Sequence, residues 1–174
     1  YCYDRYHREA NERSESDYIR NYGYKPYPNF LTTTENTDKI LYEGVELEAD
    51  DINDLSACTN ALYALSDNEK LFYMKSDGSL SSDEGVEVVT HPATLEFHRT
   101  SFPWGNIIST IDDYDGTSHA NGHCGLHVHV NRDFFANDEL ASLKLVYIFD
   151  KHWDKLVKFS RRKDFSYCEK PDEI

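Results

Sequence analysis

Apolar and polar side chains alternate along several stretches of this chain, which is the pattern of β-strands with one buried face. The clearest case is residues 40–48, where valine and leucine alternate with glutamate over positions 45–48. Residues 71–75 and the β-branched run 85–90 predict two further strands, and residues 124–131 predict a fourth. In this fourth strand we expect three apolar side chains to point into the core: Leu126, Val128 and Val130.

Between the strands, apolar residues recur at helical spacing. After the first strand they predict a helix over 52–65, for which Asp50 or Asp51 offers an N-cap. Residues 95–111 predict two shorter helical pieces, because Pro103 interrupts the pattern.

A longer apolar stripe predicts a single helix from Asp138 to Ser160, and a weaker pattern over residues 14–22 allows a short helix near the start. Strands that alternate with helices indicate an α/β or α+β domain. The connection lengths leave the order of the strands in the sheet open.

The first part of the chain differs from the rest. Residues 1–37 are polar, rich in tyrosine and interrupted by Pro26 and Pro28, so we interpret them as a tail or linker and residues 38–174 as the folded domain. The sequence starts without a methionine, and we expect it to be a piece of a longer protein. Cys2 is then a candidate for the last ligand of a zinc ribbon whose other cysteines lie upstream.

Composition narrows the class of protein. The 18 Lys and Arg residues against 32 Asp and Glu give a net charge of -14, which repels nucleic acid and anionic membranes and attracts cations. No apolar run approaches the roughly 18 residues of a membrane-spanning helix. The four cysteines include no C-x-x-C pair, so we expect reduced thiols in a cytoplasmic protein. The acidic charge and the lack of a long apolar run lead us to expect no nucleic acid and no membrane as partners.

Two histidines give the strongest chemical signal. His127 and His129 are two positions apart in a predicted strand, so their imidazoles share one face, about 6–7 Å apart along the backbone. Such a pair can converge on one cation, or divide between a metal and an anion. The alternative is a pair of surface histidines on an edge strand.

Three glutamates add carboxylates to this picture. Glu46 and Glu48 share one strand face, where a cation would relieve their repulsion; a solvated face of an amphipathic strand is the alternative. Glu87 lies within a β-branched run that is typical of a buried strand. A buried carboxylate needs a partner for its charge, and a metal ion is a suitable one. Carboxylates with one imidazole favour a hard divalent ion such as Mg²⁺ or Mn²⁺, and such ions suit nucleotide phosphates.

Positive charge gathers in residues 151–163, where six Lys and Arg residues face one Asp. Arg161 and Arg162 are therefore candidates for binding an anionic substrate. Simple complementarity to the dipole of a helix C-terminus is the alternative, and it accounts for most of these residues.

Three segments, in this order along the chain, resemble the amidoligases of the glutamine synthetase and glutamate–cysteine ligase superfamily. They are residues 44–48 (GVELE), 85–92 (GVEVVTHP) and 124–131 (CGLHVHVN), and the resemblance covers about residues 40–168. It implies an α+β fold with a curved, mainly antiparallel sheet and helices packed on one face, as in the glutamine synthetase catalytic domain. It also implies that ATP phosphorylates a carboxylate and that an amine then displaces the phosphate, which forms an amide or isopeptide bond.

By this resemblance no residue acts as a covalent nucleophile, since positioning and charge neutralisation carry the reaction. The implied metal ligands are four: Glu46, Glu48, Glu87 and His127. His129 would lie near the ATP phosphates, and Asn131 would meet the nucleotide. The partners expected are ATP, a carboxylate and an amine.

One departure from the family leaves other functions open. Nothing after Arg162 supplies the E-x-R motif with which the family completes its site, so the domain is expected to be incomplete at its C-terminus, and an inactive nucleotide-binding relative or fragment is an alternative. Cupins also use H-x-H on a strand, but they want a glycine where Asn121 stands. A zinc hydrolase would need a further ligand beside the two histidines, and the sequence offers none that is obvious.

Overall fold

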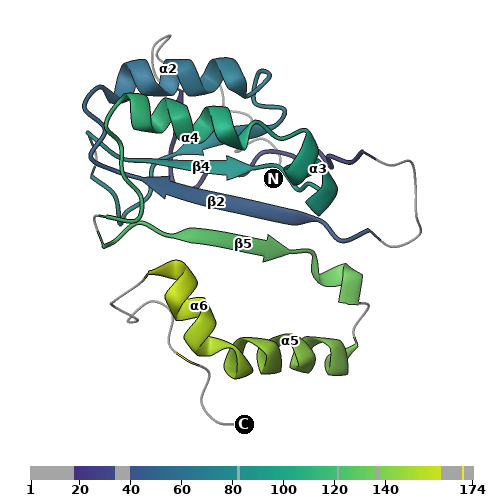
Figure 1. Cartoon of the computed structure of the whole chain (residues 1–174). Coiled ribbons are helices and arrows are strands. Elements are labelled where there is room, and N and C mark those ends of the chain that lie inside the picture. The colour runs from purple at the N-terminus through teal and green to yellow at the C-terminus, as the bar shows by residue number, and fades with distance from the viewer. Residues whose placement is uncertain are drawn as a thin grey trace. The chain divides into compact units, whose positions relative to one another are not determined.

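The computed structural model describes residues 18–33, 40–81, 83–120, 122–135, 138–161 and 170 (Figure 1). The chain divides into two compact units, residues 1–130 and 131–174. Within the described residues, no helix is both long and apolar enough to cross a membrane.

The first unit contains a five-stranded mixed sheet with the order β1-β3-β4-β2-β5. Its strands are these: β1 Ile19–Arg20, β2 Glu43–Ala49, β3 Phe72–Lys75, β4 Val86–Thr90 and β5 Leu126–Val130. β1 pairs with β3 in parallel, and the other neighbours pair antiparallel. The predicted α+β class and the mainly antiparallel pairing are therefore confirmed.

Three helices accompany the sheet: α2 Leu55–Leu65, α3 Leu95–Thr100 and α4 Trp104–Asp113. α2 and α4 lie side by side (Figure 1). The predicted N-cap of α2 was wrong, because Asp54, not Asp50 or Asp51, accepts a hydrogen bond from the backbone N–H of Ala57 at 2.9 Å. Pro103 separates α3 from α4, as the sequence predicted.

The core lies between one face of the sheet and the two longer helices. β3 and β4 contribute Phe72, Met74 and Val88, all essentially inaccessible to solvent. α2 contributes Leu62, and α4 contributes Ile107. Burial of each such side chain stabilises the fold by about 1.5–3 kcal/mol. Because the helices cover this face, the polar side chains of the alternating strands point to the opposite face.

The described part of residues 1–37 belongs to this unit. Residues 19–20 form β1, and the ring of Tyr18 stacks on Tyr63 of α2 with 3.9 Å between centroids. Arg20 forms a largely buried ion pair with Glu69 at 2.8 Å. The short helix expected over residues 14–22 is wrong for residues 18–22, which form a strand and a turn because β3 offers them a pairing edge. Residues 14–17 lie outside the described residues.

β5 differs from expectation in its burial. Leu126 and Val128 are 56% and 57% exposed, and Val130 is exposed as well. These side chains do point to the helical side of the sheet, because Leu126 pairs with Leu47 and Val128 with Val45. However, β5 is an edge strand, and the described helices of this unit pack over the strands farther in, so the alternation was correct and the predicted burial was wrong.

The second unit holds a short 3₁₀ helix, η1 Arg132–Phe135, and two helices, α5 Glu139–Lys151 and α6 Trp153–Ser160. The single helix expected from 138 to 160 is therefore wrong. His152 leaves the helical conformation (φ -111°, ψ 16°) and caps the end of α5, so the apolar stripe is divided between two shorter helices. None of the described side chains of α5 and α6 is buried.

Candidate functional site

The strand register gathers the predicted acids and imidazoles on one face of the sheet. Glu46 lies opposite His127, and Glu48 lies opposite Glu87. Directly opposed residues of antiparallel strands project to the same side. The prediction that the carboxylates and the histidines share one face is therefore confirmed.

The same register extends this face to β3. Lys75 pairs with Glu87, while Tyr73 pairs with Val89, the residue opposite Glu46. We call this surface the polar face and define it by seven residues: Tyr73, Lys75, Glu46, Glu48, Glu87, His127 and His129.

Glu46 binds both histidines. Its Oε2 lies 3.1 Å from Nδ1 of His127 and 3.2 Å from Nε2 of His129. Burial raises the pKa of Glu46, but the hydrogen bonds from His129 and His127 outweigh burial and leave the pKa below its usual value. Both imidazoles are about half exposed, so ligands from solvent can reach them.

Glu48 is held by the backbone of the neighbouring strand segment. Its side chain is nearly buried, and its Oε2 accepts a hydrogen bond from the N–H of Gly125 at 2.6 Å. The backbone N–H of Glu48 donates in turn to the carbonyl of Gly125 at 3.1 Å. This double contact fixes the carboxylate beside the start of β5.

Glu87 is the most deeply buried carboxylate of the polar face, at 3% exposure. Its Oε2 is buried and has no hydrogen-bond partner among the described residues; its contact is the ammonium of Lys75 at 3.5 Å. Burial raises the pKa of Glu87; the charge of Lys75 opposes that shift, and the charges of Glu46 and Asp77 add to it. The predicted burial of Glu87 is confirmed, and Lys75 is a partner that the sequence did not reveal.

Tyr73 and Asp77 are further groups that the sequence analysis missed. Burial raises the pKa of Tyr73, and the nearby carboxylates of Glu46 and Glu87 raise it further. Hydrogen bonds from Ser79 lower the pKa of Asp77, as do the charges of Lys75 and His127. The signal for Tyr73 was present, because alternation in residues 72–75 places it on one face with Lys75, but neither residue belongs to a familiar motif.

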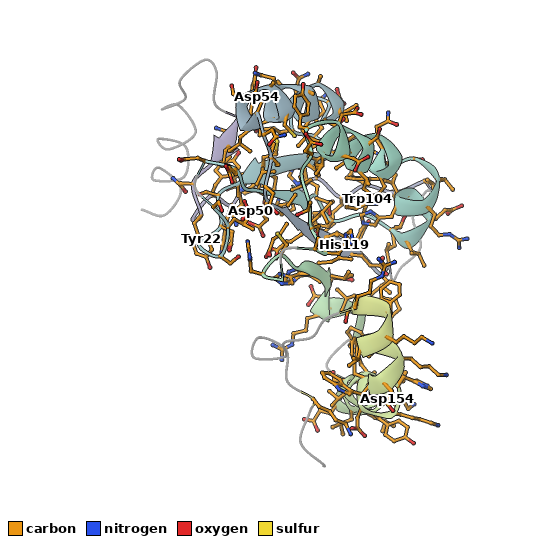
Figure 2. All side chains as sticks on the ribbon, turned by 60° about the vertical axis from the view of Figure 1, so that its left-hand side comes forward. Tyr22, Asp50, Asp54, Trp104, His119 and Asp154 are labelled. Carbon is orange, nitrogen blue, oxygen red and sulfur yellow. The ribbon has the colours of Figure 1, made fainter. Side chains whose placement is uncertain are left out.

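A second carboxylate–imidazole pair lies at the end of β2. Asp50, which Figure 2 labels, is fully buried, and its Oδ2 lies 2.8 Å from Nε2 of His123. The backbone N–H groups of Ser81 and Asp51 also donate to this carboxylate. Burial raises the pKa of Asp50, but these hydrogen bonds outweigh burial and lower it. The pairing with His123 was not predicted, because 73 positions separate the two residues.

Other candidates from the sequence lie elsewhere. Asn131 and Arg161 belong to the second unit, where Arg161 ends α6 in a left-handed conformation (φ 56°). Arg162 and Cys2 lie outside the described residues. His91 bonds the backbone of Asn29 and Glu69, in keeping with the structural alternative for this residue.

The residues of the polar face fit a hard divalent cation by their chemistry. The face offers carboxylate oxygens beside imidazole nitrogens, and a set of carboxylates with a single imidazole suits Mg²⁺ or Mn²⁺. One of these oxygens, Oε2 of Glu87, is buried without a hydrogen bond. In the described part of the chain, however, no group of three or more His, Cys, Asp or Glu side chains is arranged as metal ligands.

No protein-family model matches this chain, and no curated protein and no solved structure shows significant similarity to it. The amidoligase resemblance therefore depends on the three sequence segments alone. The geometry of the polar face adds a physical argument that is independent of it.

Proposed function

We propose that this chain is an amidoligase-like domain that binds ATP with Mg²⁺ or Mn²⁺ and joins a carboxylate to an amine. The observation that carries the proposal is the convergence of Glu46, Glu48 and Glu87 with His127 on one sheet face. A glutamine synthetase-like form of the α+β fold is part of the same proposal. The three segments that carry the resemblance are the strands of this face and their flanking residues.

In this proposal Glu46, Glu48 and His127 hold the metal, with Glu87 as the further ligand that the resemblance implies. A divalent ion at this place supplies charge neutralisation for phosphate oxygens. His129 contacts the phosphates, since its imidazole is exposed beside Glu46. For Asn131 the resemblance implies a contact with the nucleotide, and Arg161 and Arg162 stay candidates from the sequence for an anionic substrate; the geometry of the polar face has no part in these assignments.

The chemistry proposed needs no nucleophile from the protein. The substrate carboxylate attacks the terminal phosphorus of ATP, the bond to ADP breaks, and an acyl phosphate forms. The amine then attacks the acyl carbon, phosphate leaves with the electron pair of the C–O bond, and the amine gives up a proton to solvent. The side chains of the polar face orient the reactants and balance the negative charge.

The test is calorimetric titration of the full chain with Mg²⁺–ATP, together with phosphate release in the presence of carboxylate and amine mixtures. Glu46→Gln and His127→Ala should each weaken Mg²⁺–ATP binding by about 10-fold or more, because each removes a metal ligand. Leu145→Ala, in α5, is the matched control and should bind as the original chain does. Unchanged binding in both site variants would refute the site.

One alternative keeps the site without turnover. This second candidate is a relative that binds the nucleotide through the same carboxylates and histidines but has no ligase activity. Mg²⁺–ATP binding without phosphate release across the substrate mixtures would favour it. Binding with substrate-dependent release would favour the ligase.

A further inference from the structure

We propose that Lys75 contacts the terminal phosphate of bound ATP and that Glu87 serves as its counter-ion rather than as a metal ligand. This inference rests on the proposed function, since it assigns a role within the same site. It adds a positive residue to the site and changes the role of one carboxylate.

Lys75 lies on the same sheet face as the proposed metal ligands. The register places Lys75, Glu87 and Glu48 in one row across β3, β4 and β2, all on the polar face. The next row along the strands holds Glu46 and His127. Arg20 of β1 pairs with Lys75 and shares this face, but its guanidinium is bound to Glu69 at 2.8 Å. Lys75 is the cation in the row that holds Glu87 and Glu48.

The ammonium of Lys75 lies in a largely buried environment. Lys75 is only 9% exposed, and its Nζ lies 3.5 Å from Oε2 of Glu87 and 5.2 Å from the ring centroid of Tyr22. Burial of a charged pair costs several kcal/mol per ion before their attraction is counted, so such pairs are weak stabilisers of a fold. A pair kept at this place therefore suits a role beyond stability.

A hollow in the surface lies near the ammonium of Lys75. Tyr22 (Figure 2), Ser76, Asp77 and Gly78 line a hollow of about 430 Å³, and the Tyr22 ring is the one that Lys75 contacts. This hollow is open to solvent, so it gives a phosphate group access but does not enclose a whole ligand. Lys75 does not line this hollow itself, but its ammonium lies 5.2 Å from the centroid of the Tyr22 ring that does, so an anionic group bound there would lie near the ammonium.

Carboxylates surround the ammonium of Lys75 on this part of the polar face. Glu46, Glu48, Glu87 and Asp77 lie around this part of the face, and a lysine ammonium is a compact point charge suited to a phosphate oxygen. The ammonium of Lys75 already lies 3.5 Å from the buried Oε2 of Glu87 and balances its charge, although it makes no hydrogen bond to it. A metal bound to Glu87 would sit beside that ammonium and be repelled by it.

The experiment compares nucleotide and metal binding in four forms of the full chain: the original, K75M, E87Q and E46Q. Titrations use Mn²⁺ alone, and ATP and ADP in the presence of Mg²⁺. We expect K75M to weaken ATP binding by roughly 10- to 100-fold, as loss of a charge-assisted contact does, and to weaken ADP binding much less. We expect E87Q to keep Mn²⁺ affinity within about twofold, while E46Q loses about 10-fold or more.

Two further variants protect the test from a folding failure. K75M leaves Glu87 as an uncompensated buried charge, so the double variant K75M/E87Q removes both charges together and should show the same selective loss of ATP binding. K75R keeps the charge and should retain the preference for ATP over ADP. Thermal unfolding by circular dichroism shows which variants are folded.

The outcomes separate the inference from the proposed function. If the original chain does not bind Mg²⁺–ATP, both are overturned. If it binds but K75M/E87Q keeps the full preference for ATP over ADP, the role of Lys75 is overturned and the proposed function stands. A loss of Mn²⁺ affinity in E87Q as large as that in E46Q would make Glu87 a metal ligand and overturn its assignment as counter-ion.

Discussion

Gly125 offers a perturbation that reaches the site without touching the core. A Cβ atom added there would lie 2.9 Å from Nε2 of His127 and 3.4 Å from Oε2 of Glu48. Both contacts are ends of polar-face side chains, so Gly125→Ala should displace the imidazole and leave the fold in place. The glycine thus allows two groups of the proposed site to approach the backbone.

The size of the effect follows from the distances. The imidazole must move from 2.9 Å to about 3.4 Å from the new methyl group, which is a shift of about 0.5 Å. If the ring moves away from Glu46 by that distance, its Nδ1–Oε2 hydrogen bond lengthens from 3.1 Å to about 3.6 Å, where it is no longer a hydrogen bond. Mutations beside metal ligands cost about 10- to 100-fold in metal affinity, and we expect a loss in that range for Mg²⁺–ATP.

The assay is calorimetric titration with Mg²⁺–ATP, accompanied by thermal unfolding. Gly44→Ala is the matched control, because Gly44 lies opposite His129 on the same face and its added Cβ meets its nearest atom only at 4.0 Å. Gly116→Ala is a second control, since its Cβ would lie 2.7 Å from Ile111 and 2.8 Å from Ile52. It should lower the melting temperature without selective loss of affinity in the folded protein.

Two results would refute this reasoning. The first is a folded Gly125→Ala variant that binds Mg²⁺–ATP as tightly as Gly44→Ala does. The second is a Gly125→Ala variant that melts as early as Gly116→Ala, because the glycine would then serve the fold and not the site.

Two predictions concern the fold. Asp54→Ala removes the side-chain cap of α2 and should cost about 1 kcal/mol of unfolding free energy in denaturant titration, whereas Asp112→Ala on the exposed side of α4 should cost little; equal losses would contradict the cap. Burial lowers the pKa of His91 below its usual 6.5. Well above pH 6.5, His91 is neutral in both the folded and the unfolded chain. Below pH 6.5, the unfolded chain takes up the proton first, so the native state loses stability. The gap in unfolding free energy between the original chain and His91→Gln should therefore narrow as the pH falls from about 7 to 5, and a constant gap would show that His91 does not resist protonation.

Local periodicity was enough to place the sheet faces. Alternation in 44–48 and 126–130 correctly paired Glu46 with Glu48 and His127 with His129 on single strand faces, because side chains of a strand alternate whatever its neighbours are. The helical pattern of residues 95–111, interrupted by Pro103, likewise predicted two separate helices. It could not give the cap at Asp54 or the break at His152, which depend on a single residue's backbone conformation.

Tertiary structure decided which side chains meet. The order β1-β3-β4-β2-β5 places β2 between β4 and β5, and only this order brings Glu46 to His127 and His129 and aligns Glu87 with Lys75. The same order leaves β5 at an edge, so its apolar residues stay exposed although their pattern reads as core. The sequence by itself determined which residues could share a face, because that is local geometry; which faces become a site depends on pairing between distant strands, which no periodicity encodes.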